Sequence, residues 1–202
     1  MTRDRHRRFD LLAALLGWFC ISPLLALLAL LIKIDSPGPA LFRQRRIGAD
    51  GRPFTLYKFR TMREPAGVTN NGTHEFGEVD FERFVFTPNR PDPRVTPIGR
   101  VLRRTSLDEM PQLINVIRGE MAIVGPRPEI PELVRQYPPA FHARHRVRPG
   151  ITGIAQIRGR SDLTYAETIR YDLAYIRRRS LRNDLAILAR TLAVVLRGTG
   201  AR

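Results

Sequence analysis

The pattern of hydrophobic and polar residues divides this chain into an apolar N-terminal segment and a longer region of short elements. Residues 11–32 include no charged residue, and this run meets the length of about 20 residues that a helix needs to cross a hydrocarbon core. A cleaved signal peptide has a shorter apolar part and a small-residue cleavage site, and no such site follows Ile32. The pattern therefore predicts that residues 1–35 form a membrane-embedded segment.

Two features of this segment bear on how it enters the membrane. Pro23 lies near its middle and removes a helical hydrogen bond, so a kink is expected beside Ser22. Basic residues flank the segment on both sides, and the positive-inside rule places both flanks in the cytoplasm: Arg3, Arg5, Arg7 and Arg8 before it, and Lys33, Arg43, Arg45 and Arg46 after it. A re-entrant helix that breaks at Ser22-Pro23 explains both features. A plain spanning helix is an equally good interpretation of these residues alone.

The rest of the chain consists of short elements separated by turns. Residues 40–47 and 53–59 are predicted to be strands of a hairpin, joined by a turn that includes Gly51. Residues 63–97 are polar and rich in Gly, Pro and Asn, which is typical of a long loop. Apolar residues at helical spacing predict helices over residues 110–117, 166–178 and 182–196.

The last of these helices has two interpretations. Its apolar residues Leu185, Leu188, Leu192 and Val195 share one face, and the basic run at residues 177–179 precedes it. An amphipathic helix of this kind either packs on the core of its own domain or lies on an anionic membrane surface. The residues favour neither interpretation over the other.

Composition limits the class of protein. The 202 residues allow one domain, or one domain and an anchor. A formal net charge of +15 indicates an anionic partner, which could be nucleic acid, anionic lipid or a phosphorylated substrate. The aromatic residues are not interleaved with the basic runs, so we expect no nucleic-acid partner. A single cysteine, Cys20, excludes a disulfide framework and a cysteine-based zinc site.

Asp108-Glu109 is the one adjacent carboxylate pair that lies between arginines and a predicted helix start. In one interpretation, Ser106 and Glu109 form a capping box and have no chemical role. Pro111 argues for a helix that begins later, near Asp108, because its missing N–H would cost a hydrogen bond in the second turn. In the other interpretation, one carboxylate is a nucleophile and its neighbour holds a divalent cation.

Three further groups of residues are weaker candidates for a functional site. The turn Gly125-Pro126-Arg127-Pro128 is either a surface turn or a rigid support for a phosphate-binding guanidinium. Residues 148–153 form a turn with two glycines, which Gln156, Arg158 and Arg160 follow, and this is a weak phosphate signal. His142 and His145 have no further metal ligand near them in the sequence, so we expect them to be exposed to solvent.

The ordered set of motifs resembles the bacterial sugar transferases, the monotopic phosphoglycosyl transferases, in their small catalytic-core form. No single motif is decisive, but the set extends over nearly the whole chain: FD at residues 9–10, ISP at 21–23, SPGP at 36–39, YKFRTM at 57–62, SLDEMPQL at 106–113, GPRP at 125–128 and RPGITG at 148–153. The chain has Glu120-Met121-Ala122 where the family usually has Asp-Met-Ser, a conservative change.

The resemblance implies an activity and a set of roles. A sugar 1-phosphate would pass from a UDP-sugar to a polyprenol phosphate such as undecaprenyl phosphate, and UMP would be released. The resemblance assigns Asp108 as the nucleophile of a covalent phosphosugar intermediate and Glu109 as the carboxylate that binds Mg²⁺. It assigns phosphate-binding or active-site roles to Arg103, Arg127, Gln156 and Arg160. It also makes Ser22-Pro23 the break of a re-entrant membrane helix.

We therefore expect an α+β protein in two parts. Residues 1–35 would form the re-entrant membrane helix, and residues 36–202 a compact, mostly helical catalytic domain with a small β-hairpin and interfacial amphipathic helices. The expected location is the bacterial inner membrane, with the catalytic domain on the cytoplasmic face. The alternatives are a membrane-anchored module that binds anionic lipid, and another Mg²⁺-dependent phosphotransferase acting on a lipid phosphate.

Overall fold

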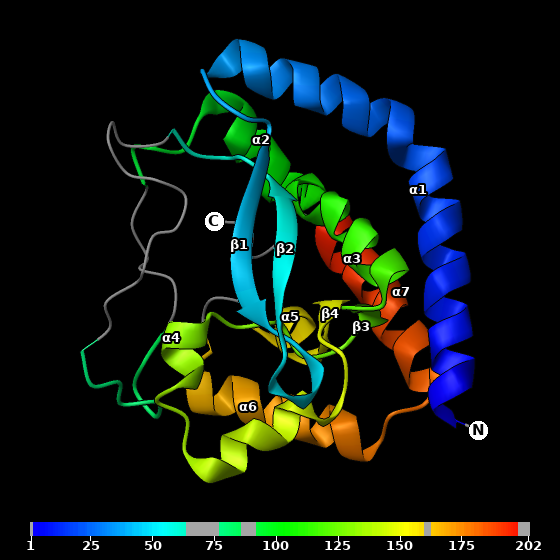
Figure 1. Cartoon of the computed structure of the whole chain (residues 1–202), viewed down its shortest axis with the longest axis vertical. Coiled ribbons are helices and arrows are strands. Elements are labelled where there is room, and N and C mark those ends of the chain that lie inside the picture. The colour runs from blue at the N-terminus through cyan, green and yellow to red at the C-terminus, as the bar shows by residue number, and fades with distance from the viewer. Residues whose placement is uncertain (1, 64–76, 86–91, 160–162, 198–202) are drawn as a thin grey trace.

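The computed structural model describes residues 2–63, 77–85, 92–159 and 163–197, and it combines helices with two small sheets (Figure 1). The helices are α1 (Thr2–Asp35), α2 (Pro97–Thr105), α3 (Leu113–Arg118), α4 (Pro131–Val134), α5 (Ile154–Arg158), α6 (Tyr165–Arg177) and α7 (Leu181–Arg197), with the 3-10 helices η1 (Ala49–Gly51), η2 (Leu107–Gln112) and η3 (Pro139–Arg146). Strands β1 (Leu41–Ile47) and β2 (Pro53–Phe59) form an antiparallel hairpin, and β3 (Ala122–Val124) pairs in parallel with β4 (Gly150–Thr152). The expected α+β class and the hairpin are confirmed.

Helix α1 bends sharply but is not interrupted. Figure 1 shows it running along one side of the molecule and then turning across the top, so its two limbs lie along two adjacent sides of the domain. Pro23 is the one proline inside the helix, and the Ser22 hydroxyl donates to the Phe19 carbonyl at 3.2 Å, one turn earlier. The expected break at Ser22-Pro23 is therefore a bend within a continuous helix, as a proline kink produces.

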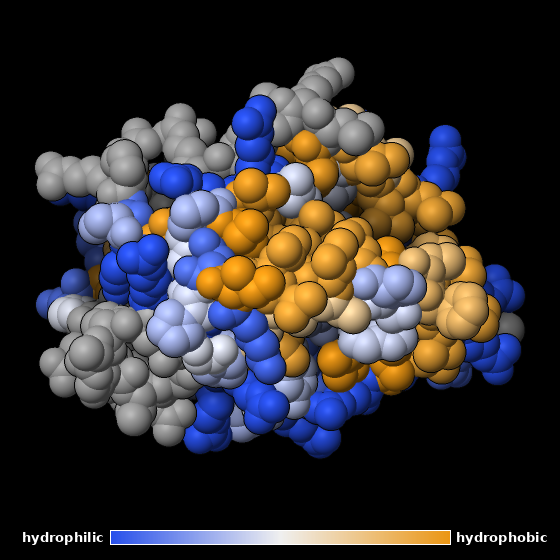
Figure 2. Space-filling model, turned by 90° about the horizontal axis from the view of Figure 1, so that it is seen from above, coloured by the Kyte–Doolittle hydropathy of each residue, from blue (hydrophilic) through white to orange (hydrophobic). Residues whose placement is uncertain are grey.

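Helix α1 has a buried face and an exposed apolar face. Ala14, Leu25 and Ile32 are buried against the hairpin, α2 and α3. Large apolar side chains on the other face are exposed: Leu12, Leu15, Leu16, Phe19, Leu24, Leu27, Leu30 and Ile34. Figure 2 shows a broad hydrophobic surface on the side of the molecule where the second limb of α1 lies. Within the described residues, α1 is the one helix long and apolar enough to cross a membrane.

Polar side chains fasten both ends of α1 to the rest of the chain. Near the C-terminal end, the buried Arg60 donates to the carbonyls of Ser36 at 2.6 Å and Pro37 at 2.5 Å. Near the N-terminal end, side chains contact α3, β3 and α7: Arg7 donates to the carbonyls of Val116 and Ile117, Asp10 accepts from the Ile123 amide, and His6 lies 3.5 Å from Asp184. Both limbs of α1 therefore have fixed positions against the same domain.

The region predicted to be a long loop contributes to the core. Phe81 is 8% exposed and lies in contact with Tyr137, Phe141 and Tyr165, with ring centroids 5.4–5.8 Å apart. The amides of Tyr165 and Ala166 donate to carbonyls at residues 84 and 81, which ties this segment to the start of α6. In the described parts of this region, residues 77–85 and 92–96, the chain forms turns and one isolated β-bridge at Val95, and Phe81 packs into a hydrophobic cluster.

Two features of the helices differ from the prediction. The helix expected over residues 110–117 begins as η2 and becomes α-helical only after Pro111, which cannot donate an α-helical hydrogen bond. Helix α2 was not predicted, although Thr96 caps it through a bond from the Gly99 amide at 2.9 Å. Helix α7 forms as predicted; Ile187 is buried in the domain, while Leu185 and Leu192 are 53% and 61% exposed, so its apolar side chains divide between core contact and exposure.

Candidate active site

A sharp turn between α2 and η2 places the two carboxylates. Ser106 has a φ of 57°, in the left-handed region, and ends α2 with its amide bonded to the Arg103 carbonyl at 3.2 Å. Its side chain makes no capping hydrogen bond to η2, so the capping-box interpretation is wrong. Helix α2 ends at this residue, and η2 then packs against β2 with Asp108 close to Lys58 of that strand.

Asp108 lies opposite Lys58 of β2. The Asp108 Oδ2 and Lys58 Nζ atoms are 3.5 Å apart, and Asp108 is 5% exposed. Burial raises the pKa of Asp108 above its usual value; Lys58 opposes this shift, Glu109 adds to it, and Arg127 and Arg103 oppose it. Burial also lowers the pKa of Lys58, against the attraction of Asp108. Asp108 is thus a desolvated carboxylate with one close ammonium partner, the environment of an activated nucleophile.

Glu109 points to a different cation. Its Oε1 atom lies 2.9 Å from Nη1 of Arg127, whose side chain remains 43% exposed. The Glu109 carboxylate is the largest influence on the Arg127 guanidinium and raises its pKa. Two adjacent carboxylates therefore have separate partners on separate elements, a lysine on β2 and an arginine on the turn after β3. The half-exposed guanidinium retains N–H groups for a phosphate.

The other predicted site residues have mixed outcomes. Arg103 lies on α2, and its Nε donates to the Thr61 hydroxyl at 3.0 Å, which directs it toward the end of β2. Gln156 lies on α5 and donates to the Ile151 carbonyl at 3.0 Å, while its Oε1 is buried without a hydrogen bond. That contact belongs to β4 rather than to the two carboxylates. Arg160 is outside the described residues.

The close approach of α2 to β2 depends on a glycine. A Cβ atom on Gly99 would lie 2.1 Å from the Thr61 carbonyl oxygen, so no larger residue fits there without a shift of the backbone. Because Arg103 lies one turn further along α2, this contact sets the distance between Arg103 and Thr61. The packing of one glycine thus determines where one cation of the site lies.

Lys58 was not singled out by the sequence reasoning, although a signal was present. The chain has two lysines, Lys33 and Lys58, while all its other basic residues, apart from histidines, are arginines. Lysine differs from arginine as a compact charge whose pKa shifts readily on burial. In this arginine-rich chain, a lysine within a mostly apolar strand is therefore a candidate for a role that depends on a compact charge with a shifted pKa.

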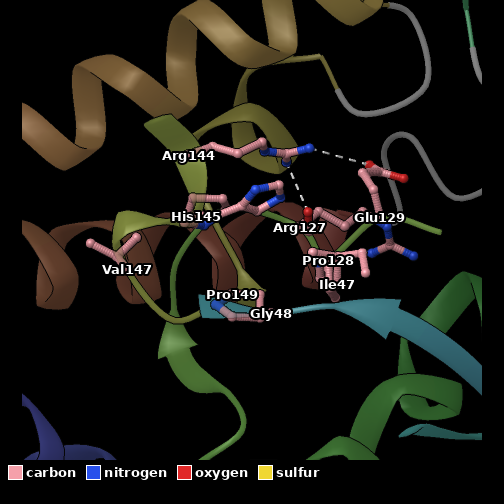
Figure 3. Close-up of a pocket in the computed structure, with 10 residues that line it drawn as sticks. Ile47, Gly48, Arg127, Pro128, Glu129, Arg144, His145, Val147 and Pro149 are labelled. Carbon is pink, nitrogen blue, oxygen red and sulfur yellow. Dashed lines mark hydrogen bonds and ion pairs between the residues drawn. The ribbon is translucent and has the colours of Figure 1, made fainter. Parts of the chain in front are cut away.

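The predicted phosphate-binding turn is rigid and lies beside a small cavity. The cavity has a volume of about 10 Å³, enough for roughly one water molecule. Arg127, Arg144 and His145 contribute to its lining, as Figure 3 shows, and neither Asp108 nor Glu109 does. His145 is half-buried and stacks on Tyr137 with an interplanar angle of 9°, so the expectation of solvent exposure holds only in part for this histidine, whereas His142 is exposed as expected.

Glu109 has the chemistry of a ligand for a magnesium ion that is shared with a substrate. No cluster of three or more metal-binding side chains occurs within the described residues. Mg²⁺ in phosphate-transferring sites is typically held by one or two carboxylates and by substrate phosphates, with water completing the shell. Glu109, whose side chain is 17% exposed beside Asp108, offers oxygen donors of that kind.

Comparison with known proteins identifies the family. The profile described as "Bacterial sugar transferase" matches residues 1–198. The chain is 41% identical over 196 residues to "Exopolysaccharide production protein ExoY" of Sinorhizobium fredii, which covers 96% of this chain and 87% of that protein. It is 44% identical over 200 residues to "UDP-glucose:undecaprenyl-phosphate glucose-1-phosphate transferase" of Caulobacter vibrioides, covering 95% of this chain and 70% of that protein. It is 36% identical over 208 residues to "Undecaprenyl-phosphate galactose phosphotransferase" of Salmonella typhimurium, covering 99% of this chain and 42% of that protein. The chain belongs to the bacterial sugar transferase family.

Proposed function

We propose that this protein is a phosphoglycosyl transferase that moves a sugar 1-phosphate from a UDP-sugar to undecaprenyl phosphate and releases UMP. Relatives whose names specify this kind of transfer are 36–44% identical over most of the chain. The observation that carries the proposal is the buried Asp108 facing Lys58 at 3.5 Å, with the Glu109–Arg127 pair directly beside it. The product would be the lipid-linked sugar that starts the assembly of an exopolysaccharide or a glycoconjugate.

In the first step, Asp108 attacks the phosphorus that carries the sugar. An Asp108 carboxylate oxygen bonds to this phosphorus, and the bond to the bridging oxygen of the diphosphate breaks, so that UMP leaves with the electron pair. The Lys58 ammonium stabilises Asp108 as a carboxylate before attack, because an adjacent positive charge offsets the cost of burial. The Arg127 guanidinium is placed to bind phosphoryl oxygens as negative charge develops there.

In the second step, an oxygen of undecaprenyl phosphate attacks the same phosphorus. The Asp108–phosphorus bond breaks, Asp108 returns as a carboxylate, and the new diphosphate links sugar and lipid. Two successive displacements allow one small site to serve a soluble donor and a lipid acceptor in turn. Arg103, on the side of Thr61, adds positive charge near Asp108 for the incoming lipid phosphate.

Magnesium would be held by Glu109 together with the diphosphate of the donor. When bound, the ion neutralises phosphoryl charge and so favours approach of an anionic nucleophile. The Arg127 guanidinium lies 2.9 Å from the Glu109 carboxylate. It holds Glu109 in position for this role and balances its charge. The neighbouring Asp108 remains paired with Lys58 and free of that role.

We infer that α1 lies in the cytoplasmic leaflet of the inner membrane as a re-entrant helix, with residues 36–202 as the catalytic domain on the cytoplasmic face. The helix bends, presents apolar side chains outward, and has both ends fastened to one domain by Arg7 and Arg60. A helix that crossed the bilayer would separate these two ends by the bilayer thickness. The exposed Leu185 and Leu192 of α7 support an interfacial position for that helix also.

The test of the proposed function uses the full chain in detergent or nanodiscs with Mg²⁺. A panel of UDP-sugars is offered with and without undecaprenyl phosphate, and UMP and intact protein mass are measured. We expect one donor or a few donors to give stoichiometric UMP and a phosphosugar adduct without the lipid, and turnover with it. Asp108→Asn should give neither, while Asp50→Asn, an exposed control in the hairpin turn, should behave as wild type.

Four outcomes would count against the proposal. Failure of every UDP-sugar to release UMP would overturn the activity. Hydrolysis of a lipid phosphate without any UMP release would instead favour another lipid-phosphate phosphotransferase. A requirement for undecaprenyl phosphate before any UMP appears, or a fully active Asp108→Asn variant, would replace the covalent route by direct attack of the lipid on the donor.

A further inference from the structure

Hydrogen bonds hold the backbone of the turn that carries Arg127. Some of the donors are backbone amides, and others are side chains outside the site. Consecutive carbonyls from residue 126 to residue 129 each accept a hydrogen bond. The donors are the Gly150 amide to Pro126 at 2.9 Å, Nη2 of Arg144 to Arg127 at 2.8 Å, Nη1 of Arg46 to Pro128 at 3.0 Å and the Ile47 amide to Glu129 at 2.8 Å. Two prolines further restrict the backbone. The two central carbonyls thus depend on two guanidinium groups.

Arg144 is the more demanding of the two donors. It lies on η3, is 2% exposed, and reaches the turn from within the domain, as Figure 3 shows. Its Nη1 donates to the hydroxyls of Tyr137 at 2.8 Å and Tyr165 at 2.9 Å, and its Nη2 donates to the Arg127 carbonyl and to Asp172 at 2.6 Å. Only a planar guanidinium offers four N–H groups in this arrangement, so a lysine could not replace it.

The charge of Arg144 is balanced without any contribution from the active-site carboxylates. Asp172 of α6 and Glu129 lie 2.6 Å and 3.8 Å from its guanidinium. Glu129 also pairs with Arg46 at 3.5 Å, which gives two buried carboxylates for two largely buried guanidinium groups. A self-contained set of this kind can hold the backbone of the turn whether or not an anionic substrate is bound.

On the far side of the same backbone, the Arg127 side chain extends toward Glu109. We propose that Arg144, assisted by Arg46, is a positioning residue for the transfer reaction: by holding the Arg127 carbonyl it sets the Arg127 guanidinium against Glu109 and toward the phosphoryl group. This inference rests on the proposed function for its kinetic consequence. Its structural part, the control of the Arg127–Glu109 pair by Arg144, does not depend on the identity of the substrate.

The kinetic test is a double-mutant cycle on the rate of UMP release in a single turnover with excess enzyme. Arg144→Lys should lower the rate on the order of 10- to 100-fold in the wild-type background, as loss of a supporting hydrogen bond at an active site typically does. In the Arg127→Ala background the same substitution should have less than about a 3-fold effect, because the group that it positions is absent. Arg170→Lys, an exposed control on α6 that pairs with Glu82, should have no effect in either background.

A purely structural role predicts something else. If Arg144→Lys only loosened the domain, it would lower the rate by the same factor in both backgrounds, and such additivity would overturn the inference. Should Arg144→Lys fail to fold, Arg46→Lys is tested in the same cycle, because Arg46 holds the next carbonyl and lies nearer the surface. Equal losses for Arg46→Lys in both backgrounds would also count against the inference.

A second measurement does not require activity. In arginine-labelled protein, the Nε–H resonance of Arg127, identified by its loss in Arg127→Ala, reports whether the guanidinium is held. We expect a resolved resonance in wild type and Arg170→Lys, and an exchange-broadened or shifted one in Arg144→Lys or Arg46→Lys. An unchanged resonance in both of these variants would overturn the inference. If no UDP-sugar were a donor, the proposed function would fail, and this measurement would still decide whether Arg144 positions Arg127.

Discussion

Lys58 and Asp108 lie 3.5 Å apart on two elements that the chain brings together from positions 50 residues apart. Lys58 comes from β2 and Asp108 from η2; Asn115, which is completely buried, lies on α3, the helix that directly follows η2. The Asn115 amide accepts from the Tyr57 amide at 3.2 Å and donates to the Thr55 carbonyl at 2.7 Å, so it occupies the edge of β2 as a neighbouring strand would. The Asn115 side chain therefore joins β2, which carries Lys58, to the helix that follows Asp108.

The first prediction concerns the pH dependence of UMP release. Asp108 attacks only as a carboxylate, and its pKa is already raised by burial, so the rate should fall on the acidic side at a higher pH than for an ordinary aspartate. Lys58→Met removes the strongest influence that lowers this pKa. The acidic limb of the pH–rate profile should then move to higher pH, with a loss on the order of 10-fold or more at neutral pH.

The control for this prediction is Lys33→Met, which removes the other lysine, an exposed residue at the end of α1. Its acidic limb should coincide with that of wild type. If Lys58→Met lowered the rate by one factor at every pH, Lys58 would act on the substrate rather than on the ionisation of Asp108.

The second prediction concerns stability. Asn115→Leu leaves the Thr55 carbonyl and the Tyr57 amide without their buried partner, and each unsatisfied group carries a desolvation cost. We expect a loss of about 2–4 kcal/mol in the free energy of unfolding, measured by denaturant titration in detergent micelles. Asn183→Ala on α7 is the matched control and should change it by less than about 1 kcal/mol. Equal effects of the two substitutions would contradict the bridging role of Asn115.

The elements that were predicted correctly are those whose pattern is complete within a few residues. Alternation and a glycine turn define the hairpin, and the capping box formed by Thr164 and Glu167 lies directly at the start of α6. The short parallel pair β3–β4 was missed because three-residue strands have too little periodicity, and their pairing depends on contacts across 28 residues of chain, such as Gly150 to Ala122.

The same reasoning explains which site residues could be predicted. Asp108 and Glu109 form a visible motif because they are adjacent in the sequence. The contacts of Lys58 and Arg144 form only in the folded chain, where β2 packs against η2 and η3 packs against the turn at Arg127. No pattern in the neighbouring residues of the sequence predicts either contact. The stacking of His145 on Tyr137 is likewise a tertiary contact, which is why this histidine is less exposed than expected.

The third prediction is that both ends of α1 lie on the cytoplasmic side. Single cysteines replace Asp4 and Lys33, one at a time, in a Cys20→Ser background, because Cys20 is itself exposed. A membrane-impermeant maleimide added to spheroplasts should label neither site, and both should react after permeabilisation. Labelling of one end alone before permeabilisation would show a helix that crosses the membrane.

The fourth prediction tests the cause of the bend. Pro23→Ala restores a helical hydrogen bond and removes a steric clash, so α1 should straighten and part of the population should become spanning. The same maleimide assay should then show partial labelling at one end. Ser22→Ala alone removes only a side-chain bond to the Phe19 carbonyl and should leave the labelling pattern unchanged. Identical patterns for Pro23→Ala and wild type would mean that the polar contacts of Arg7 and Arg60 are sufficient to hold the bend.

The last prediction separates the roles of the two members of the Glu109–Arg127 pair. Glu109→Gln keeps the shape of the side chain but removes the negative charge that would hold Mg²⁺, so its activity should require more Mg²⁺ and recover in part when the ion is raised. Arg127→Lys keeps the charge but loses the planar fork, so it should bind phosphoryl oxygens less well at any Mg²⁺ concentration. Titration of Mg²⁺ against the initial rate of UMP release measures both.

Because the two side chains are 2.9 Å apart, each substitution also weakens the ion pair for the other residue. A pair that served only to stabilise the fold would give two variants with the same magnesium dependence and matching losses of stability. Glu132→Gln, at an ion pair with the exposed Arg135, provides a control for the loss of a glutamate charge and should titrate as wild type. A shifted magnesium midpoint confined to Glu109→Gln would therefore place the ion at this carboxylate, and superimposable titrations for Glu109→Gln and Arg127→Lys would contradict that assignment.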